Sequence, residues 1–243
     1  MKQIFRVLSA MLALVLCAGC GSQKQAAVDA GTDLREHSFS AMNTYITMQA
    51  NGPDAEEALL AAEELVRRQE EHLSVTREGS EIYAANHSGG VSVTLSRETA
   101  ELLALTLDMA RQTGGALDPT IYPVLTAWSF TTESRQVPAQ AELDALLPLV
   151  DYTKITLSDH TVTVPDGMAL DLGAVAKGDT GDRAAALLRE QGVTSGLLSL
   201  GGNVQAIGRK PDGSPWRIGV RNPFSEENLG VLEVAIRVLN YCW

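Results

Sequence analysis

Asp171-Leu-Gly-Ala-Val-Ala-Lys-Gly-Asp-Thr-Gly-Asp182 is the stretch that most constrains this chain of 243 residues. It groups a carboxylate, glycines, a lysine and two further carboxylates at the beginning of a predicted helix over residues 174–191. Such a segment presents backbone N–H groups, one cation and one acceptor to a phosphate or a polar ring. Two more glycine-containing polar loops occur at residues 114–120 and 198–204. Together the three loops indicate a site for a large ligand that carries phosphate.

Hydrophobic spacing around these loops predicts an α+β fold, with helices packed on a mostly antiparallel sheet in a single domain. Ser80 and Ser96 stand where helix N-caps are preferred, and glycines follow two of the helices. Helices are expected at residues 53–68, 80–86, 96–113, 138–147 and 174–191. Strands are expected at residues 37–50, 91–95, 154–157, 161–164, 196–200, 204–208, 216–220 and 230–239.

The N-terminus has the pattern of an export signal. Lys2 and Arg6 precede an apolar run that is too short for a stable membrane span. The run ends in Leu-Cys-Ala-Gly-Cys20, which resembles the lipobox of bacterial lipoproteins, where this cysteine is acylated. We therefore expect a domain that is lipid-anchored at Cys20 to the extracytoplasmic face of the cell membrane; an ordinary secretory signal cleaved nearby is the alternative. The expected parts are a signal peptide at residues 1–20, a flexible tether at 21–36 and a folded domain at 37–243.

The charge balance, the cysteines and the glycine spacing argue against nucleic-acid binding, an internal disulfide and a Walker A loop. The formal net charge is −11, and removal of residues 1–20 with Lys2 and Arg6 would lower it to −13. Because no basic stripe is present, we do not expect a nucleic-acid partner. Cys242 is the one cysteine beyond residue 20, so no internal disulfide is expected in the mature chain. The lysine of the 173–178 segment precedes its last glycine, which excludes a Walker A loop.

Taken in order, several segments resemble the ApbE-type FAD:protein FMN transferases. The resemblance covers about residues 38–236, and the ordered set of motifs is specific although each motif alone is weak. The motifs are Ala41-Met-Asn-Thr44, Gly115-Ala-Leu-Asp-Pro-Thr-Ile-Tyr-Pro123, Trp128-Ser-Phe130, the 171–178 run, Asp182-Arg-Ala, Gly201-Gly202 and Asp212-Gly-Ser-Pro-Trp-Arg-Ile-Gly219.

The resemblance implies a Mg²⁺-dependent enzyme with FAD as its substrate. Such an enzyme cleaves the pyrophosphate of FAD, transfers FMN to a Ser or Thr hydroxyl of a target flavoprotein and releases AMP. The implied partner is a flavoprotein subunit of a membrane redox pump, which the enzyme meets at the membrane that holds its lipid anchor. Phosphoryl transfer depends on positioning and charge neutralisation, for which glycine-opened backbone is suited.

The same resemblance assigns the site residues. It places Met42 and Thr44 in the flavin pocket and gives the backbone carbonyl of Ala174 to Mg²⁺. Taken alone, an aspartate before Pro119 is typical of a turn, and one before a helix is typical of a cap, so both aspartates also have a structural interpretation. The residues implied to contact FAD are Ala116, Leu117, Asp118, Asp171 and Lys177.

The chain also departs from the family pattern. Asn43 replaces the glycine of a Met-Gly-Thr turn, and because Asn accepts positive φ better than most residues, we expect the turn to be kept. The family continues past residues 231–236 with a Thr-Ser-Gly segment and a His-Ile-x-Asp-Pro-x-Thr-Gly motif, which supply an Asp and a Thr to the metal. Neither motif occurs here. The chain as written is therefore expected to be incomplete at its C-terminus, to expose an apolar last strand, to fold poorly and not to transfer FMN.

Three functions stay open at this point. The first is FMN transfer, and the second is a FAD-binding lipoprotein without transferase activity, which the absent metal-ligand motifs favour. The third is a solute-binding or structural lipoprotein. Bound flavin separates the first two from the third, and release of AMP from FAD separates the first from the second.

Overall fold

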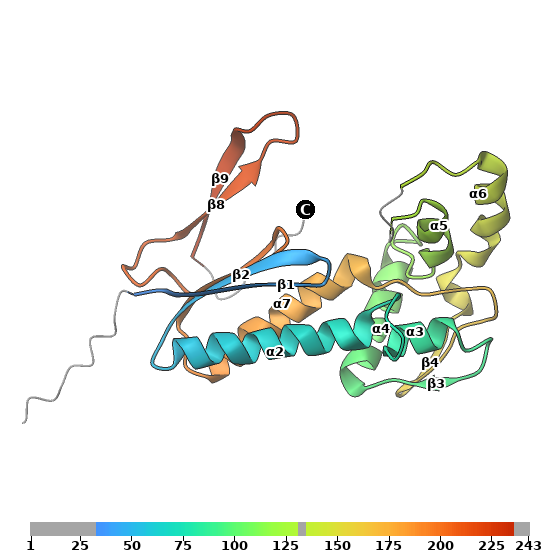
Figure 1. The fold of residues 1–243 in the computed structure, drawn as a ribbon, viewed down its shortest axis with the longest axis horizontal. Coiled ribbons are helices and arrows are strands. Elements are labelled where there is room, and N and C mark those ends of the chain that lie inside the picture. The colour runs from blue at the N-terminus through green and yellow to red at the C-terminus, as the bar shows by residue number, and fades with distance from the viewer. Residues whose placement is uncertain (1–32, 131–134, 236–243) are drawn as a thin grey trace, which may run out of the picture. The chain divides into compact units, whose positions relative to one another are not determined.

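A computed structural model of the protein describes residues 33–130 and 135–235, and residues 32–243 group as one unit (Figure 1). The proposed signal peptide, Cys20, Cys242 and most of the proposed tether lie outside the described residues. The first strand begins at Arg35, within the stretch predicted as tether. Among the described residues, no helix combines the length and the apolar character that a membrane span requires.

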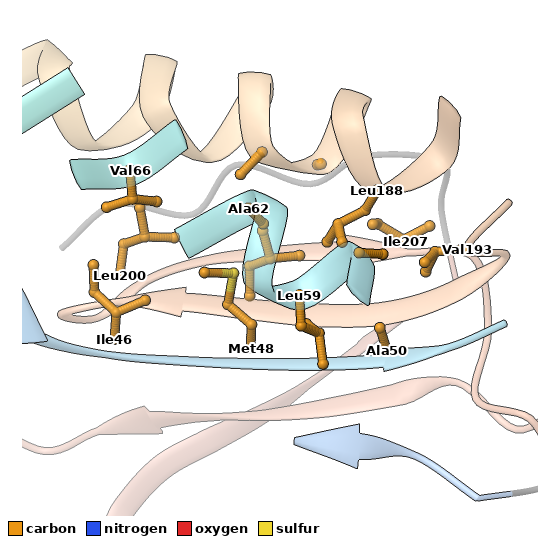
Figure 2. Packing of buried hydrophobic residues seen from close by; sticks show 14 of the residues in the cluster. Ile46, Met48, Ala50, Leu59, Ala62, Val66, Leu188, Val193, Leu200 and Ile207 are labelled. Atoms are coloured by element: carbon orange, nitrogen blue, oxygen red, sulfur yellow. The ribbon is translucent and has the colours of Figure 1, made fainter. Parts of the chain in front are cut away.

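The first part of the core lies between a four-stranded antiparallel sheet and two long helices. The strand order is β1-β2-β6-β7, and α2 and α7 pack on this sheet and on each other. Figure 2 shows Leu59, Ala62 and Val66 of α2 together with Ile46 and Met48 of β2, all buried. The bounds are β1 Arg35–Ala41, β2 Thr44–Asn51, β6 Ser195–Leu200, β7 Asn203–Ile207, α2 Ala55–Leu73 and α7 Gly173–Glu190.

The prediction of one strand over residues 37–50 is wrong, because the chain turns back at Met42 and Asn43. Ala41 pairs with Thr44, so β1 and β2 form a hairpin with a two-residue turn. Met42 has φ 51° and Asn43 has φ 55°, the left-handed pair that such tight turns need. The turn expected at Asn43 is present. The apolar alternation hid it because side chains on both arms of a hairpin continue to alternate between two faces.

A second part of the core combines short helices with a small sheet in the order β3-β5-β4. Ser80 and Ser96 cap α3 and α4 as predicted, each accepting a hydrogen bond from the N–H three residues later. Apolar spacing does not predict helix α5, because six residues are too few to show a clear helical period. The bounds are α3 Glu81–Asn86, β3 Val93–Thr94, α4 Arg97–Gln112, α5 Tyr122–Ala127, α6 Gln140–Leu146, β4 Thr156–Ser158 and β5 Thr161–Thr163, with 3-10 turns at Leu147–Leu149 and Tyr152–Lys154.

The last hairpin consists of β8 (Trp216–Arg221) and β9 (Asn228–Val234). Trp216 and Val234 form a small third cluster with Ala206 of β7. Leu229 and Val231 of β9 are exposed, in agreement with an apolar last strand. The strand begins two residues earlier than predicted, and residues 236–243 lie outside the described part of the chain. The α+β class with mostly antiparallel sheet is confirmed.

Candidate functional site

The turn at Met42 is held in an unusual conformation. A residue other than glycine with positive φ is uncommon, and such strain persists only where the surroundings impose it. The N–H of Met42 donates a hydrogen bond of 2.8 Å to Glu70 Oε1, and its side chain packs against both large hydrophobic clusters. Met42 therefore lies where the two parts of the core meet. Strain imposed in this way is characteristic of binding sites.

The Gly201-Gly202 loop closes on the same hairpin. The N–H of Gly201 donates a hydrogen bond of 3.2 Å to the carbonyl of Tyr45. A Cβ at position 201 would lie 2.8 Å from Cβ and 2.9 Å from Cγ2 of Thr44, so no side chain fits there. The close backbone approach expected of this glycine is thus present. Beside it is a hollow of about 420 Å³ lined by Ser40, Ala41, Asn43, Thr44 and Glu70.

Asp171 is fixed just before α7. Its N–H donates a hydrogen bond of 2.7 Å to the carbonyl of Pro119, and its Oδ1 accepts one of 2.8 Å from the N–H of Gly173. A Cβ at residue 173 would lie 2.9 Å from that Oδ1, which explains the glycine at the first position of the helix. Burial raises the pKa of the Asp171 carboxyl, and the Gly173 amide and the Lys177 cation offset part of that rise. Leu172 occupies the N-cap position of α7, so Asp171 stands one residue before it and is not the side-chain cap that was predicted. Its half-buried carboxylate holds the N–H of Gly173 and interacts electrostatically with Lys177.

Tyr122 is a further candidate site residue beside Asp171. Burial raises the pKa of its hydroxyl, and the neighbouring carboxylate of Asp171 adds to the rise. The side chain is half-buried at the first position of α5. The sequence feature that could have identified Tyr122 is its place in the motif Gly115-Ala-Leu-Asp-Pro-Thr-Ile-Tyr-Pro123. Tyr122 and Lys177 thus both interact electrostatically with Asp171, which raises the pKa of Tyr122 and whose own pKa Lys177 acts to lower.

Asp118 organises the loop in front of α5. Its Oδ1 accepts hydrogen bonds from the N–H (2.8 Å) and the hydroxyl (2.6 Å) of Thr120, and its Oδ2 accepts one of 3.1 Å from the N–H of Tyr152. These three bonds support the turn interpretation of Asp118. Its contact with FAD stays a prediction, and so do the contacts of Ala116, which is exposed, and Leu117, whose N–H is held by Thr113 Oγ1.

The glycine-containing loops at residues 114–120 and 198–204 lie in different parts of the structure. Residue Ile121 pairs with Ala169 in a parallel bridge, which places the Asp118 loop beside the segment that leads into Asp171. Gly201 lies instead against Thr44 and the Met42 turn. Met42 contacts the hydrophobic cluster that contains Leu170 and Leu172, the two neighbours of Asp171. The two groups of predicted site residues are therefore connected through this cluster.

The side chains described do not by themselves make a magnesium site. In residues 33–130 and 135–235 no group of three or more His, Cys, Asp or Glu side chains is placed to hold a metal ion. Ala174 lies in the first turn of α7, so its carbonyl follows the helix direction, and Asp171 is the carboxylate nearest to it in sequence. Mg²⁺ requires about six oxygen ligands in octahedral geometry. The described residues offer the Ala174 carbonyl and the Asp171 carboxylate nearby in the sequence, so water and ligand phosphates would have to supply the remaining oxygens.

Comparison with known proteins decides the family. The family model described as "ApbE family" matches residues 42–239. The chain belongs to the ApbE family. A relative named FAD:protein FMN transferase from Klebsiella pneumoniae (strain 342) is 33% identical over 202 residues, which cover 80% of this chain and 61% of the relative. One of the same name from Escherichia coli (strain K12) is 25% identical over 240 residues, covering 94% of this chain and 68% of the relative.

Solved structures of this ApbE family have the same fold. The ApbE protein of Thermotoga maritima MSB8 superposes with a TM-score of 0.77 at 27% identity, covering 84% of this chain and 68% of that one. The apo form of the Pseudomonas stutzeri flavinyl transferase ApbE gives a TM-score of 0.75 at 25% identity, covering 84% and 67%. The chain therefore spans about two thirds of the length of the family members that it matches.

Proposed function

We propose that this ApbE family member binds FAD and transfers its FMN part to a Ser or Thr hydroxyl of a flavoprotein, releasing AMP. The proposal is supported by the relatives that are named FAD:protein FMN transferase. The observation within the structure that carries it is the half-buried Asp171 carboxylate, held before α7 with Lys177 close by. A carboxylate and a cation at the beginning of a long helix suit a ligand that has both polar hydrogens and phosphates.

The reaction needs little covalent chemistry from the protein. The acceptor hydroxyl oxygen forms a bond to the phosphorus of the FMN half, and the bond from that phosphorus to the bridging oxygen breaks. AMP leaves with the bridging oxygen, and the hydroxyl proton passes to a base or to water. In this arrangement Lys177 offsets phosphate charge, and Asp171 accepts a hydrogen bond that orients the ligand. Positioning and charge neutralisation are the main requirements of phosphoryl transfer.

The proposed activity includes a requirement for Mg²⁺, which comes from the family resemblance. Because the described side chains do not form a magnesium site, we assign no step of the reaction to the metal. The same observation favours a second candidate function, which is FAD binding without transfer. Both candidates need the ligand contacts of Asp171 and Lys177, whereas only the first needs release of AMP.

The decisive experiment incubates the purified full chain with FAD and an acceptor peptide that bears a threonine, with Mg²⁺ or with EDTA. AMP and fluorescent flavinylated peptide that form only with Mg²⁺ would support transfer. They would also overturn the expectation, drawn from the absent C-terminal motifs, that the chain as written does not transfer FMN. Bound FAD without AMP would support the second candidate. An absence of both would reject the two proposals and leave the solute-binding or structural alternative.

Asp171→Asn tests the site itself. Loss of a hydrogen bond to a charged group costs about 1.5–3 kcal/mol, so FAD should bind roughly ten- to a hundredfold more weakly. Asp108→Asn is the matched control, because Asp108 is a partly exposed helix residue paired with Arg111. Equal FAD affinity in both variants would show that Asp171 only holds the N–H of Gly173.

The setting of the activity is also a proposal. We place the protein on the extracytoplasmic face of the cell membrane, anchored by lipid on Cys20, with a flavoprotein subunit of a membrane redox pump as its target. The lipobox-like residues 16–20 and the stretch of small and polar residues that follows support this placement. Cys20→Ser should abolish incorporation of labelled palmitate. Continued labelling of that variant would contradict the anchor.

A further inference from the structure

Asn86, the last residue of α3, holds a distant backbone segment with both ends of its side-chain amide. Its Nδ2 donates a hydrogen bond of 2.8 Å to the carbonyl of Leu170, and its Oδ1 accepts one of 2.7 Å from the N–H of the same residue. The two residues are 84 positions apart in the chain. A carboxamide that pairs with both backbone groups of one residue does what a neighbouring β-strand would do.

The opposite edge of the same segment is held by a different element. Asp171 donates its N–H to the carbonyl of Pro119 at 2.7 Å, and Ala169 pairs with Ile121 in a parallel bridge. In extended backbone the N–H and C=O groups of successive residues point to opposite edges. The backbone groups of Leu170 therefore point away from the Pro119 side and meet Asn86. The segment over residues 169–171 is thus fixed along both edges.

The backbone groups that Asn86 holds are buried. Leu170 and Leu172 are 0% and 1% exposed, so the backbone between them lies in a region from which water is largely excluded. Without Asn86, the N–H and C=O of Leu170 would lose their partners, and buried backbone groups are nearly always paired. The backbone would then shift toward other partners. Asp171 lies next in the chain and would move with it.

We propose that Asn86 is a positioning residue that sets the location of the Asp171 carboxylate for ligand binding. The proposal rests on the proposed function, since it assigns Asp171 to FAD. Asn86 acts through the backbone of Leu170 and is not itself assigned a contact with FAD. It joins α3 to the site in the way that Asp118 joins the Tyr152 turn to it.

The test compares Asn86→Ala with Thr106→Val. Thr106 is buried on α4 and donates a hydrogen bond of 2.7 Å to the carbonyl of Leu102. Its variant therefore removes a buried hydrogen bond that does not involve residues 169–171. Both variants should lower the melting temperature. Asn86→Ala should weaken FAD binding by about ten- to a hundredfold, because a small misplacement of a binding group has effects of that order. Thr106→Val should leave FAD affinity unchanged.

A double-mutant cycle separates positioning from general stability. In the Asp171→Asn background, Asn86→Ala should cause no further loss of FAD affinity but should still lower the melting temperature. An equal loss of affinity in both backgrounds would overturn the proposal. If the unmutated protein does not bind FAD at all, the proposed function fails and the cycle cannot be read.

In that case a measurement without ligand decides the positioning role. Carbon-13 NMR of the Asp171 carboxyl should give a pKa above the ordinary value in the unmutated protein, because burial raises it. In Asn86→Ala that pKa should fall toward the ordinary value, and in Thr106→Val it should stay raised. An unchanged pKa in Asn86→Ala would overturn the proposal independently of FAD.

Discussion

Gly201→Ala should destabilise the protein through a contact that can be isolated by a matched control. A Cβ at position 201 would lie 2.8 Å from Cβ of Thr44 and 2.9 Å from its Cγ2. Rotation of the threonine side chain moves Cγ2 but not Cβ, because Cβ is attached directly to the backbone. Either the hairpin turn or the Gly201 loop must therefore move.

The expected magnitude has two parts. Gly201 has φ +61°, and left-handed backbone costs about 1–2 kcal/mol in a residue that has a Cβ. Forcing an extra methyl group into a packed region costs about 1–3 kcal/mol more. Gly89 has φ +60°, and a Cβ added there would meet nothing within 4 Å, so Gly89→Ala carries only the first part. The total for Gly201→Ala is roughly 2–5 kcal/mol, a large share of a typical stability of about 5–15 kcal/mol.

The assay is urea unfolding of both variants and the unmutated protein, with the free energy of unfolding extrapolated to water. Gly201→Ala should lose about 1–3 kcal/mol more than Gly89→Ala, since the steric contact is the difference between them. Losses that agree within about 0.5 kcal/mol would refute the reasoning, because only backbone strain would then be at work.

Two further predictions concern pH. The raised pKa of Asp171 means that its ionised form opposes folding: the penalty is absent below the pKa of an unfolded aspartate and is complete above the folded pKa. Asp171→Asn should therefore raise the melting temperature of the ligand-free protein at pH 7 but not in acid, and an equal effect at both pH values would contradict this. For Glu81, burial raises the pKa, but hydrogen bonds from Thr99, Ser96 and His72 outweigh it and lower the pKa overall. The stability that ionised Glu81 contributes is present above the pKa of an unfolded glutamate and is lost as pH falls through the pKa in the folded protein. Urea unfolding should therefore show that Glu81→Gln destabilises the protein by about 1–3 kcal/mol at pH 7 and by less in acid.

The sequence by itself determined the elements whose signals are local. Ser80 and Ser96 were identifiable as caps because a capping hydroxyl and the N–H that it accepts from are only three residues apart. The ends of α4 and α7 were marked by Gly114 and Gly192, which have φ 63° and 85°. The long helices and strands β6 and β7 followed from apolar spacing, whereas β1 and β2 did not. The turn at Asn43 was expected only from the family resemblance, since residues 37–50 alternate without a break.

Only the tertiary structure decided how the site is assembled. Asn86 meets Leu170 across 84 positions, and Asp118 meets the N–H of Tyr152 across 34. Tyr122 comes close to Asp171 because α5 follows a strand-like segment that pairs with the one before α7. These contacts leave no period in the sequence, because they depend on how finished elements dock and not on the preferences of neighbouring residues. A carboxylate such as Asp171 was visible in the sequence, whereas its burial and the groups that hold it were set by that docking.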